Sequence, residues 1–198
     1  MFDEKGVNLT ELKNAELDQL FSSVDGDELV SHSGGGSGGY LEHIFAFAAK
    51  ELFGKNIDDI TYKTLRNKDF KEVTLQVDGQ DVLKFAAAYG FRNIQNLVQK
   101  IKRGKSPYHF VEVMACPSGC LNGGGQIRPG DEETPKELIS RLDELYNSLR
   151  SRKPGENPVV EKLYKEWLDG DSSEKVNEML HTKYHEVEKL NTALNIKW

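Results

Sequence analysis

Apolar residues recur at helical spacing in two segments of this chain. The first is Tyr40–Phe53, with the sequence YLEHIFAFAAKELF, and Gly54 follows it where a left-handed helix cap belongs. The second covers residues 94–101 and closes at Gly104. Each pattern predicts an amphipathic helix that buries one face.

Strand patterns lie between and after these two helices. Residues 60–65, 72–77 and 81–88 are predicted strands, and Asp78-Gly79 is a hairpin signal between the second and the third. Residues 108–114 form a further apolar strand that leads into a loop. The order of helix, strands, hairpin, helix and strand is typical of an α/β layer, which is the fold class that we predict for residues 32–130.

The pattern beyond Asp131 indicates helices only. Thr134 to Glu137 reads TPKE, a capping box with proline at the first helical position, and leucines follow it on one stripe. Pro158 starts a second helix, which is expected to turn Val159, Leu163, Trp167 and Leu168 inward, and a short third helix contains Met179 and Leu180. Residues 1–31 are polar and acidic, with no strand pattern. We therefore divide the chain into a loosely ordered lead-in (1–31), an α/β region (32–130) and a helical tail (131–198).

Composition narrows the classes of protein to consider. The 198 residues are 37% hydrophobic and carry a formal net charge of −6. No apolar run approaches the roughly 20 residues that a membrane-spanning helix needs. Acidic and basic residues are mixed along the predicted helices, so the sequence offers no basic face for nucleic acid. We expect a soluble intracellular protein that binds neither membrane nor nucleic acid.

Two cysteines follow the last predicted strand at close spacing. Cys116 and Cys120 are the only cysteines of the chain, and Gly123 to Gly125 come directly after them. Thiolates are the usual ligands of iron-sulfur clusters, and glycines allow the backbone to approach one closely. A cubane cluster takes four such ligands, so this is half a site. A disulfide, a zinc site including His109, and two chemically inert cysteines are the alternatives that spacing leaves open.

At these residues the chain resembles the iron-only hydrogenase family. The segment MACPSGCLNGGGQ is similar to the last cluster-binding signature of that family, and SGGYLEHIF is similar to its Gly-Gly-x-x-Glu helix start. The segments ENPVVEKLYKEWLDG and MLHTKYH resemble the family's small subunit. Within the family, three features look most like one subgroup, the nuclear prelamin A recognition factor-like proteins of cytosolic iron-sulfur protein assembly. These features are Ser118, the SHSGGGSGG segment and a terminal tryptophan. Ser118 and Ile127 stand where hydrogenases usually carry glycine and proline.

The resemblance implies a fold and a function. The fold would be the carboxyl-terminal layer of the hydrogenase large subunit followed by a helical small-subunit-like tail. Cys116 and Cys120 would ligate a [4Fe-4S] cluster whose remaining ligands come from outside this chain. The function implied is a cluster-binding component of cytosolic iron-sulfur assembly, acting as an adaptor or cluster carrier and not as an enzyme. An [FeFe]-hydrogenase and an inert truncated fragment are the alternatives.

The resemblance also implies partners and a location. Apoprotein clients and the cytosolic iron-sulfur targeting complex are the expected partners, the latter through Trp198, although Lys197 departs from the usual acidic or small penultimate residue. The expected location is the cytoplasm, and also the nucleus. Because family members carry further cysteine signatures before this region, the chain is expected to be the carboxyl-terminal portion of a longer protein.

Several polar residues near the cysteines allow two interpretations each. Glu112 either tunes a cluster or is held by hydrogen bonds, and Asn122 and Gln126 either donate amides to cluster sulfur or close the turn. The segment SHSGGGSGG, residues 31–39, is either a flexible linker or a packed loop before a helix. The pair His181 and His185 is expected to serve packing and hydrogen bonding, since two ligands do not make a metal site.

Overall fold

A computed structural model describes residues 2–13, 15, 24–25, 28–65 and 67–185 of the chain. These residues belong to two compact units, Met1–Asn157 and Pro158–Trp198, which we describe separately. Single 3-10 turns occur at Asp3–Lys5, Leu9–Glu11 and Pro154–Glu156. The division at residues 31 and 131 remains a prediction. Trp198 lies outside the described residues.

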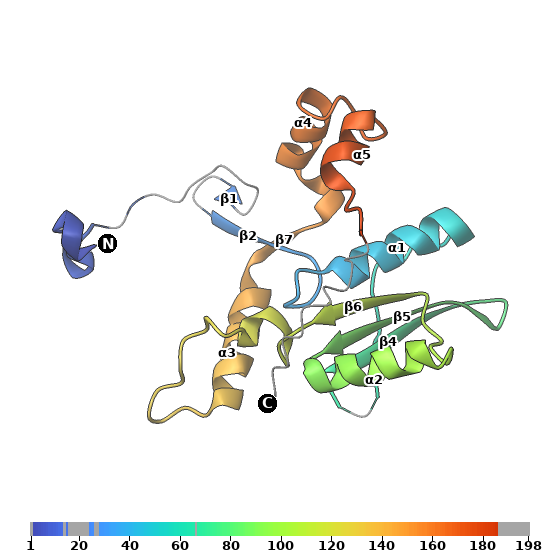
Figure 1. The fold of residues 1–198 in the computed structure, drawn as a ribbon, viewed down its shortest axis with the longest axis horizontal. Helices are drawn as coiled ribbons and strands as arrows, with labels where there is room; N and C mark the ends of the chain where they lie inside the picture. The colour runs from blue at the N-terminus through green and yellow to red at the C-terminus, as the bar shows by residue number, and fades with distance from the viewer. Residues whose placement is uncertain (1, 14, 16–23, 26–27, 66, 186–198) are drawn as a thin grey trace, which may run out of the picture. The chain divides into compact units, whose positions relative to one another are not determined.

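A four-stranded sheet forms the centre of the first unit (Figure 1). Its strands are β3 (Lys63–Thr64), β4 (Phe70–Val77), β5 (Gln80–Tyr89) and β6 (Phe110–Met114), in that spatial order. The β4–β5 pair is antiparallel and β5–β6 is parallel. Asp78 and Gly79 both have positive φ, 52° and 80°, as a two-residue hairpin turn requires. The predicted hairpin is therefore confirmed, whereas of predicted strand 60–65 only two residues form β3.

Two helices cover opposite faces of this sheet (Figure 1). Helix α1 (Tyr40–Phe53) packs Leu41, Phe45 and Ala49 against the inward side chains of β4 and β5. Phe45 and Phe85 meet edge to face, with ring centroids 5.2 Å apart. Helix α2 (Phe91–Lys102) buries Leu97 on the other side. Both helices begin or end within a few residues of the predicted positions, because their local apolar spacing matches the core they face.

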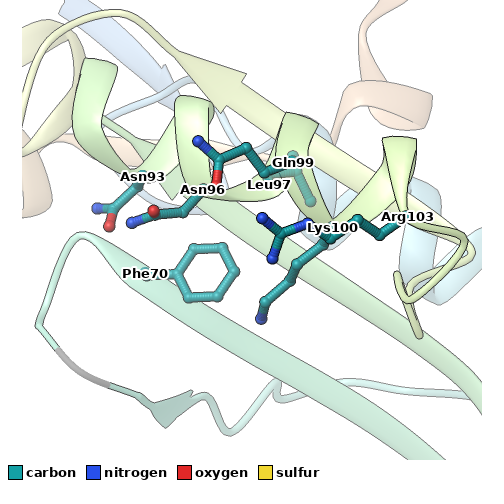
Figure 2. Close-up of a pocket in the computed structure, with 7 residues that line it drawn as sticks. All are labelled: Phe70, Asn93, Asn96, Leu97, Gln99, Lys100 and Arg103. Atoms are coloured by element: carbon teal, nitrogen blue, oxygen red, sulfur yellow. The ribbon is translucent and has the colours of Figure 1, made fainter.

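A shallow cavity lies between α2 and β4 (Figure 2). Its volume is about 230 Å³, and Phe70 faces the amide and cationic side chains of α2 across it. Lys100 Nζ lies 5.7 Å from the centroid of the Phe70 ring. The residues around it come from β4, from α2 and from Arg103, which caps α2, so this cavity is separate from the two cysteines.

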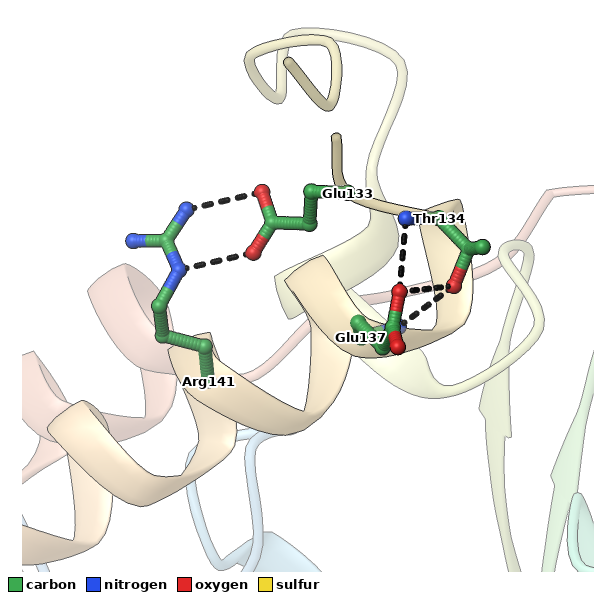
Figure 3. Close-up of polar contacts among 4 residues, drawn as sticks. All are labelled: Glu133, Thr134, Glu137 and Arg141. Atoms are coloured by element: carbon green, nitrogen blue, oxygen red, sulfur yellow. Dashed lines mark hydrogen bonds and ion pairs between the residues drawn. The ribbon is translucent and has the colours of Figure 1, made fainter. Parts of the chain in front are cut away.

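Helix α3 (Pro135–Ser148) begins with the capping box read from the sequence (Figure 3). The Glu137 N–H donates to Thr134 Oγ1 over 3.3 Å, and the Thr134 N–H donates to Glu137 Oε2 over 2.8 Å. Arg141 also forms a two-pronged pair with Glu133 at 2.8 and 3.0 Å. Donors left unpaired at a helix start are satisfied in this way, so the predicted start of α3 is confirmed.

A second, small sheet contradicts two expectations. It contains β1 (Val24–Asp25), β2 (Glu28–His32) and β7 (Arg150–Arg152), with β2 and β7 parallel. The expectations of no strand before Ser31 and of helices only after Asp131 are therefore wrong. These strands are short and polar, so no periodicity marks them. They exist because distant segments meet, and Asp25 Oδ2 accepts from Arg150 Nη2 at 2.5 Å and Arg152 Nη2 at 2.8 Å.

The second unit contains α4 (Pro158–Glu166) and α5 (Glu174–Leu180). Ser173 caps α5 by accepting from the Val176 N–H over 3.1 Å. Leu168 is buried as expected, but Leu163 and Trp167 are 39% and 48% exposed, so their predicted inward orientation is wrong. His181 and His185 follow the end of α5, which removes the helical spacing that two metal ligands would need. None of the helices among the described residues is both long and apolar enough to span a membrane.

Candidate functional site

Strands β5 and β6 bring the cysteine loop to one edge of the central sheet. They are parallel, with Tyr89 opposite Met114, so their carboxyl ends lie together. The Gly90 N–H donates to the Met114 carbonyl over 2.9 Å, at the point where both strands end. The loop that carries Cys116 and Cys120 therefore leaves the sheet beside the start of α2.

The backbone between the two cysteines turns sharply. Ser118 and Gly119 both lie in the left-handed region, with φ of 63° and 77°, and the Gly119 N–H donates to the Cys116 carbonyl over 3.1 Å. A 3-10 turn, Gly119–Asn122, then contains Cys120. Both thiols are free; Cys116 is half-buried and Cys120 is exposed. The two thiols are thus available to bind a ligand, and no disulfide joins them in this structure.

Glycines allow the loop to pack closely against the rest of the unit. A Cβ placed on Gly36 would lie 2.9 Å from Leu121 Cδ1, and one placed on Gly90 would lie 3.2 Å from Pro117 Cγ. Within the glycine-rich turn, a Cβ on Gly39 would lie 2.1 Å from the Ser33 carbonyl oxygen. Real Cβ atoms do not approach backbone this closely. Residues 31–39 are therefore a packed loop and not a flexible linker.

Glu112 connects the cysteine-bearing strand to helix α1. The residue is 6% exposed, and its carboxylate accepts from the Leu41 N–H over 2.9 Å and from the Tyr89 hydroxyl over 2.5 Å. Burial raises the pKa of Tyr89, and the hydrogen bond to Glu112 raises it further. Leu41 lies in the first turn of α1, where a negative charge is favoured. Glu112 is accordingly held by hydrogen bonds, which is the second of the two interpretations of this residue.

The amides of Asn122 and Gln126 close the turn. Asn122 Nδ2 donates to the Pro117 carbonyl and Gln126 Nε2 donates to the Leu121 carbonyl, each over 3.0 Å. Both contacts link residues five positions apart within the loop. Turn closure is therefore the role that the structure gives these amides.

Asp69 contacts the loop from a turn distant in sequence, and our sequence analysis did not single it out. Its Oδ1 accepts from the Ser118 N–H over 2.7 Å, across a separation of 49 residues. Asp69 lies between β3 and β4 in a polar turn, where an aspartate is ordinary. No local signal distinguishes it from the other turn aspartates.

The space beside the loop is open and is lined by both polar and apolar side chains. A cavity of about 800 Å³ lies next to it, bordered by Ser118, Tyr62, Glu42 and part of α3. Tyr62 donates its hydroxyl to Glu42 Oε1 over 2.7 Å, and burial, with this hydrogen bond, raises the pKa of Tyr62. Within the described part of the chain, the buried Glu42 Oε2 has no hydrogen-bond partner. Further polypeptide has room to approach the loop from this side.

The loop presents ligand chemistry that can be compared with what an iron-sulfur cluster needs. Two free thiols on one loop match the ligand type that clusters prefer. A Cβ on Gly124 or Gly125 would meet nothing within 4 Å, so the loop leaves room beside it. Among the described residues, no group of three or more His, Cys, Asp or Glu side chains could hold a metal ion. His109 Nδ1 accepts from the Lys84 N–H over 3.0 Å, so the zinc alternative gains no support from it.

Comparisons with known proteins agree with this fold. The model of the "Iron only hydrogenase large subunit, C-terminal domain" matches residues 1–124, and that of the "Iron hydrogenase small subunit" matches residues 135–187. A solved variant of the [FeFe]-hydrogenase HydA1 from Chlamydomonas reinhardtii superposes with a TM-score of 0.63 at 28% identity, covering 92% of this chain and 52% of that one. The predicted hydrogenase-like α/β fold class, with its helical small-subunit region, is confirmed.

Relatives match the chain over all or nearly all of its length. "Cytosolic Fe-S cluster assembly factor narfl" from Danio rerio is 58% identical over 100% of this chain and 48% of its own length. "Cytosolic iron-sulfur assembly component 3" from Rattus norvegicus is 57% identical, over 100% of this chain and 41% of its own length. "Nuclear prelamin A recognition factor" from Mus musculus is 50% identical over 94% of this chain and 40% of its own length. The chain thus spans less than half the length of these relatives. It belongs to the iron-only hydrogenase family.

Proposed function

We propose that this chain is the carboxyl-terminal, cluster-binding portion of a cytosolic iron-sulfur protein assembly factor. The observation that carries the proposal is the 55–58% identity, over the whole chain, to relatives that bear this description in their names. The solved [FeFe]-hydrogenases are 27–28% identical. The chain is thus about twice as similar to the assembly proteins as to the enzymes.

In this proposal Cys116 and Cys120 hold a [4Fe-4S] cluster together with ligands from outside the chain. Two free thiols on one backbone-constrained loop support it, because thiolates are the preferred cluster ligands. Such a cluster would supply a redox-active or transferable inorganic group. The chain's own residues position the thiols: Asn122 and Gln126 close the turn, and the glycines at 36 and 90 let the loop pack closely.

The proposed role is that of an adaptor or cluster carrier without hydrogenase activity. Ser118 and Ile127 stand where hydrogenases usually carry glycine and proline. Ser118 occupies a left-handed conformation that glycine adopts more readily, so this chain carries at that position a residue that suits its backbone less than glycine would. The hydrogenase alternative predicts hydrogen evolution from the purified, cluster-loaded protein. Its detection would replace our proposal.

The central experiment measures cluster binding in the full-length protein. Purified under anaerobic conditions, the unmodified protein is expected to contain iron and sulfide and to show the absorption of a [4Fe-4S] cluster. Cys116→Ala and Cys120→Ala are each expected to reduce that content, because each removes a thiolate ligand. His181→Ala, at an exposed histidine outside the loop, is the matched control and should retain the cluster. Full iron and sulfide content in both cysteine variants would refute the assignment.

The locations in this proposal follow the words cytosolic and nuclear in the names of the relatives, and the partners follow the family resemblance of the sequence. We assign apoprotein clients and the cytosolic iron-sulfur targeting complex as partners, with Trp198 as the contact to that complex, and the cytoplasm and nucleus as the locations. Deletion of Trp198 is expected to weaken capture of the targeting complex, while Trp167→Phe in the second unit should not. Equal capture of the targeting complex by both variants would refute the role of Trp198 as the contact.

A further inference from the structure

Asp69 lies at the centre of a hydrogen-bonded connection between three segments of the first unit. Its carboxylate accepts from the Ser118 N–H in the cysteine loop over 2.7 Å. Its carbonyl accepts from the Tyr89 N–H at the end of β5 over 2.9 Å. Its own N–H donates to Asn67 Oδ1 over 3.0 Å. One residue thus joins the β3–β4 turn, the end of β5 and the cysteine loop.

Asn67 extends the connection to helix α2. Asn67 and Asn93 exchange side-chain hydrogen bonds at 3.2 and 3.1 Å, and Asn93 Nδ2 donates to the Tyr89 carbonyl over 2.8 Å. Asn93 belongs to the first turn of α2, which packs on the sheet. The turn that carries Asp69 is therefore fixed from both sides, and its carboxylate is presented to the loop by a rigid support.

The contact falls where the loop most needs support. Ser118 has a φ of 63°, a conformation that non-glycine residues adopt only when their surroundings hold them there. It is also the central residue between Cys116 and Cys120. A carboxylate accepting from a backbone N–H is among the stronger hydrogen bonds in proteins. The Asp69–Ser118 bond therefore stabilises the backbone conformation that sets the relative orientation of the two thiols.

We propose that Asp69 is a positioning residue that holds the Cys116–Cys120 loop in its cluster-binding conformation before a cluster arrives. That the loop binds a cluster rests on the proposed function. That Asp69 holds the loop in one conformation does not depend on the proposed function. Asp69 acts through the Ser118 backbone and contributes no ligand itself. Its loss should leave two cysteines whose orientation varies, so that a cluster forms more slowly on them.

The first test measures the loop without any cluster. Hydrogen exchange of the Ser118 amide in the cluster-free protein is expected to become about 10- to 100-fold faster in Asp69→Ala, the factor that one hydrogen bond to a charged group accounts for. Asp69→Asn keeps an acceptor oxygen and should give a smaller increase. Asp81→Ala removes an equal charge at an exposed position of β5 and is the matched control. Unchanged exchange in Asp69→Ala would overturn the proposal.

The second test measures the thiols and the cluster in the same variants. Alkylation of Cys116 and Cys120 should be altered in rate in Asp69→Ala and not in Asp81→Ala, and the rate of cluster reconstitution should fall several-fold. A cluster that forms at the unmodified rate, with an unmodified electron paramagnetic resonance spectrum, would overturn the proposal even if exchange accelerates. If Asp69→Ala does not fold, Asp69→Asn carries both measurements.

The outcomes separate this proposal from the proposed function. If the unmodified protein and Cys116→Ala both contain no cluster, the proposed function fails. The alkylation rates then decide the role of Asp69 by themselves: altered rates keep it as a positioning residue of a two-thiol loop, and unaltered rates refute it.

Discussion

The removal of the Glu112 carboxylate is the perturbation with the largest expected effect on the central sheet. Glu112 is 6% exposed and accepts from the buried Leu41 N–H and from the half-buried Tyr89 hydroxyl. These bonds connect β6 to α1 and to β5, the two elements against which the cysteine-bearing strand packs. In Glu112→Ala both donors would lose their partner, and water cannot replace it at the Leu41 N–H inside the core.

The expected loss of stability follows from these two contacts. A hydrogen bond to a charged group contributes about 1.5–3 kcal/mol, so two of them contribute about 3–6 kcal/mol. Removal of the charge also removes its desolvation cost, which brings the net loss for Glu112→Ala to about 3–5 kcal/mol. Domains have a free energy of unfolding of about 5–15 kcal/mol, so a loss of this size should remove a large part of the stability and be readily measurable. Glu112→Gln keeps one acceptor oxygen and should lose about half as much.

Urea denaturation followed by circular dichroism measures this loss. The matched control is Glu51→Ala, at an exposed glutamate of α1, which should stay within about 0.5 kcal/mol of the unmodified protein. Glu112→Gln, Tyr89→Phe and the double variant form a cycle that isolates the contact between the two side chains. We expect a coupling energy of about 1.5–3 kcal/mol.

Two results would refute this reasoning. One is a loss below about 1 kcal/mol for Glu112→Ala, which is what an exposed glutamate would give. The other is additivity of Glu112→Gln and Tyr89→Phe, which would mean that their short hydrogen bond contributes nothing to stability.

Three further predictions concern the cap of α3, the cysteine loop and the tyrosines. Thr134→Ala removes the α3 capping box and should lower stability by about 1 kcal/mol, measured by urea denaturation. Ser118→Gly relieves a left-handed conformation and should raise the Tm slightly or leave it unchanged, since glycine's greater freedom in the unfolded chain offsets part of the gain. Burial, with hydrogen bonds to carboxylates, raises the pKa of Tyr62 and Tyr89, so the unfolded chain should ionise first and the Tm should fall as the pH rises above about 10.

Each of these predictions has a matched control. Lys136→Ala, in the same turn of α3, should leave the stability unchanged; a loss equal to that of Thr134→Ala would contradict the capping argument. Gly119→Ala, at a φ of 77°, should destabilise, and a gain there would contradict the strain argument. Tyr62→Phe should reduce the alkaline fall in Tm, whereas Tyr184→Phe, at a side chain 94% exposed, should not. Equal alkaline slopes in all three proteins would refute the role of buried tyrosines.

Local patterns in the sequence predicted the elements whose formation depends on neighbouring residues. Helix α1 and its Gly54 cap, the Asp78-Gly79 hairpin and the Thr134 capping box all appear as expected. Their signals lie within a few residues, because helix spacing, turn conformation and capping are short-range interactions. The family motif likewise identified the cysteine loop, since its two thiols and three glycines are contiguous. The assignment of Cys116 and Cys120 as cluster ligands remains a prediction.

The sequence by itself thus determined the helices, the hairpin and the loop that carries the cysteines, whereas the tertiary structure decided what holds that loop in place. Asp69 meets Ser118 across 49 residues and Glu112 meets Leu41 across 71. Strands β2 and β7 pair although more than a hundred residues separate them. In each case the partner is chosen by the packing of the sheet, and the contact is made by a polar side chain or by the backbone. A polar side chain carries no mark of a distant partner, because the contact exists only after the core has formed.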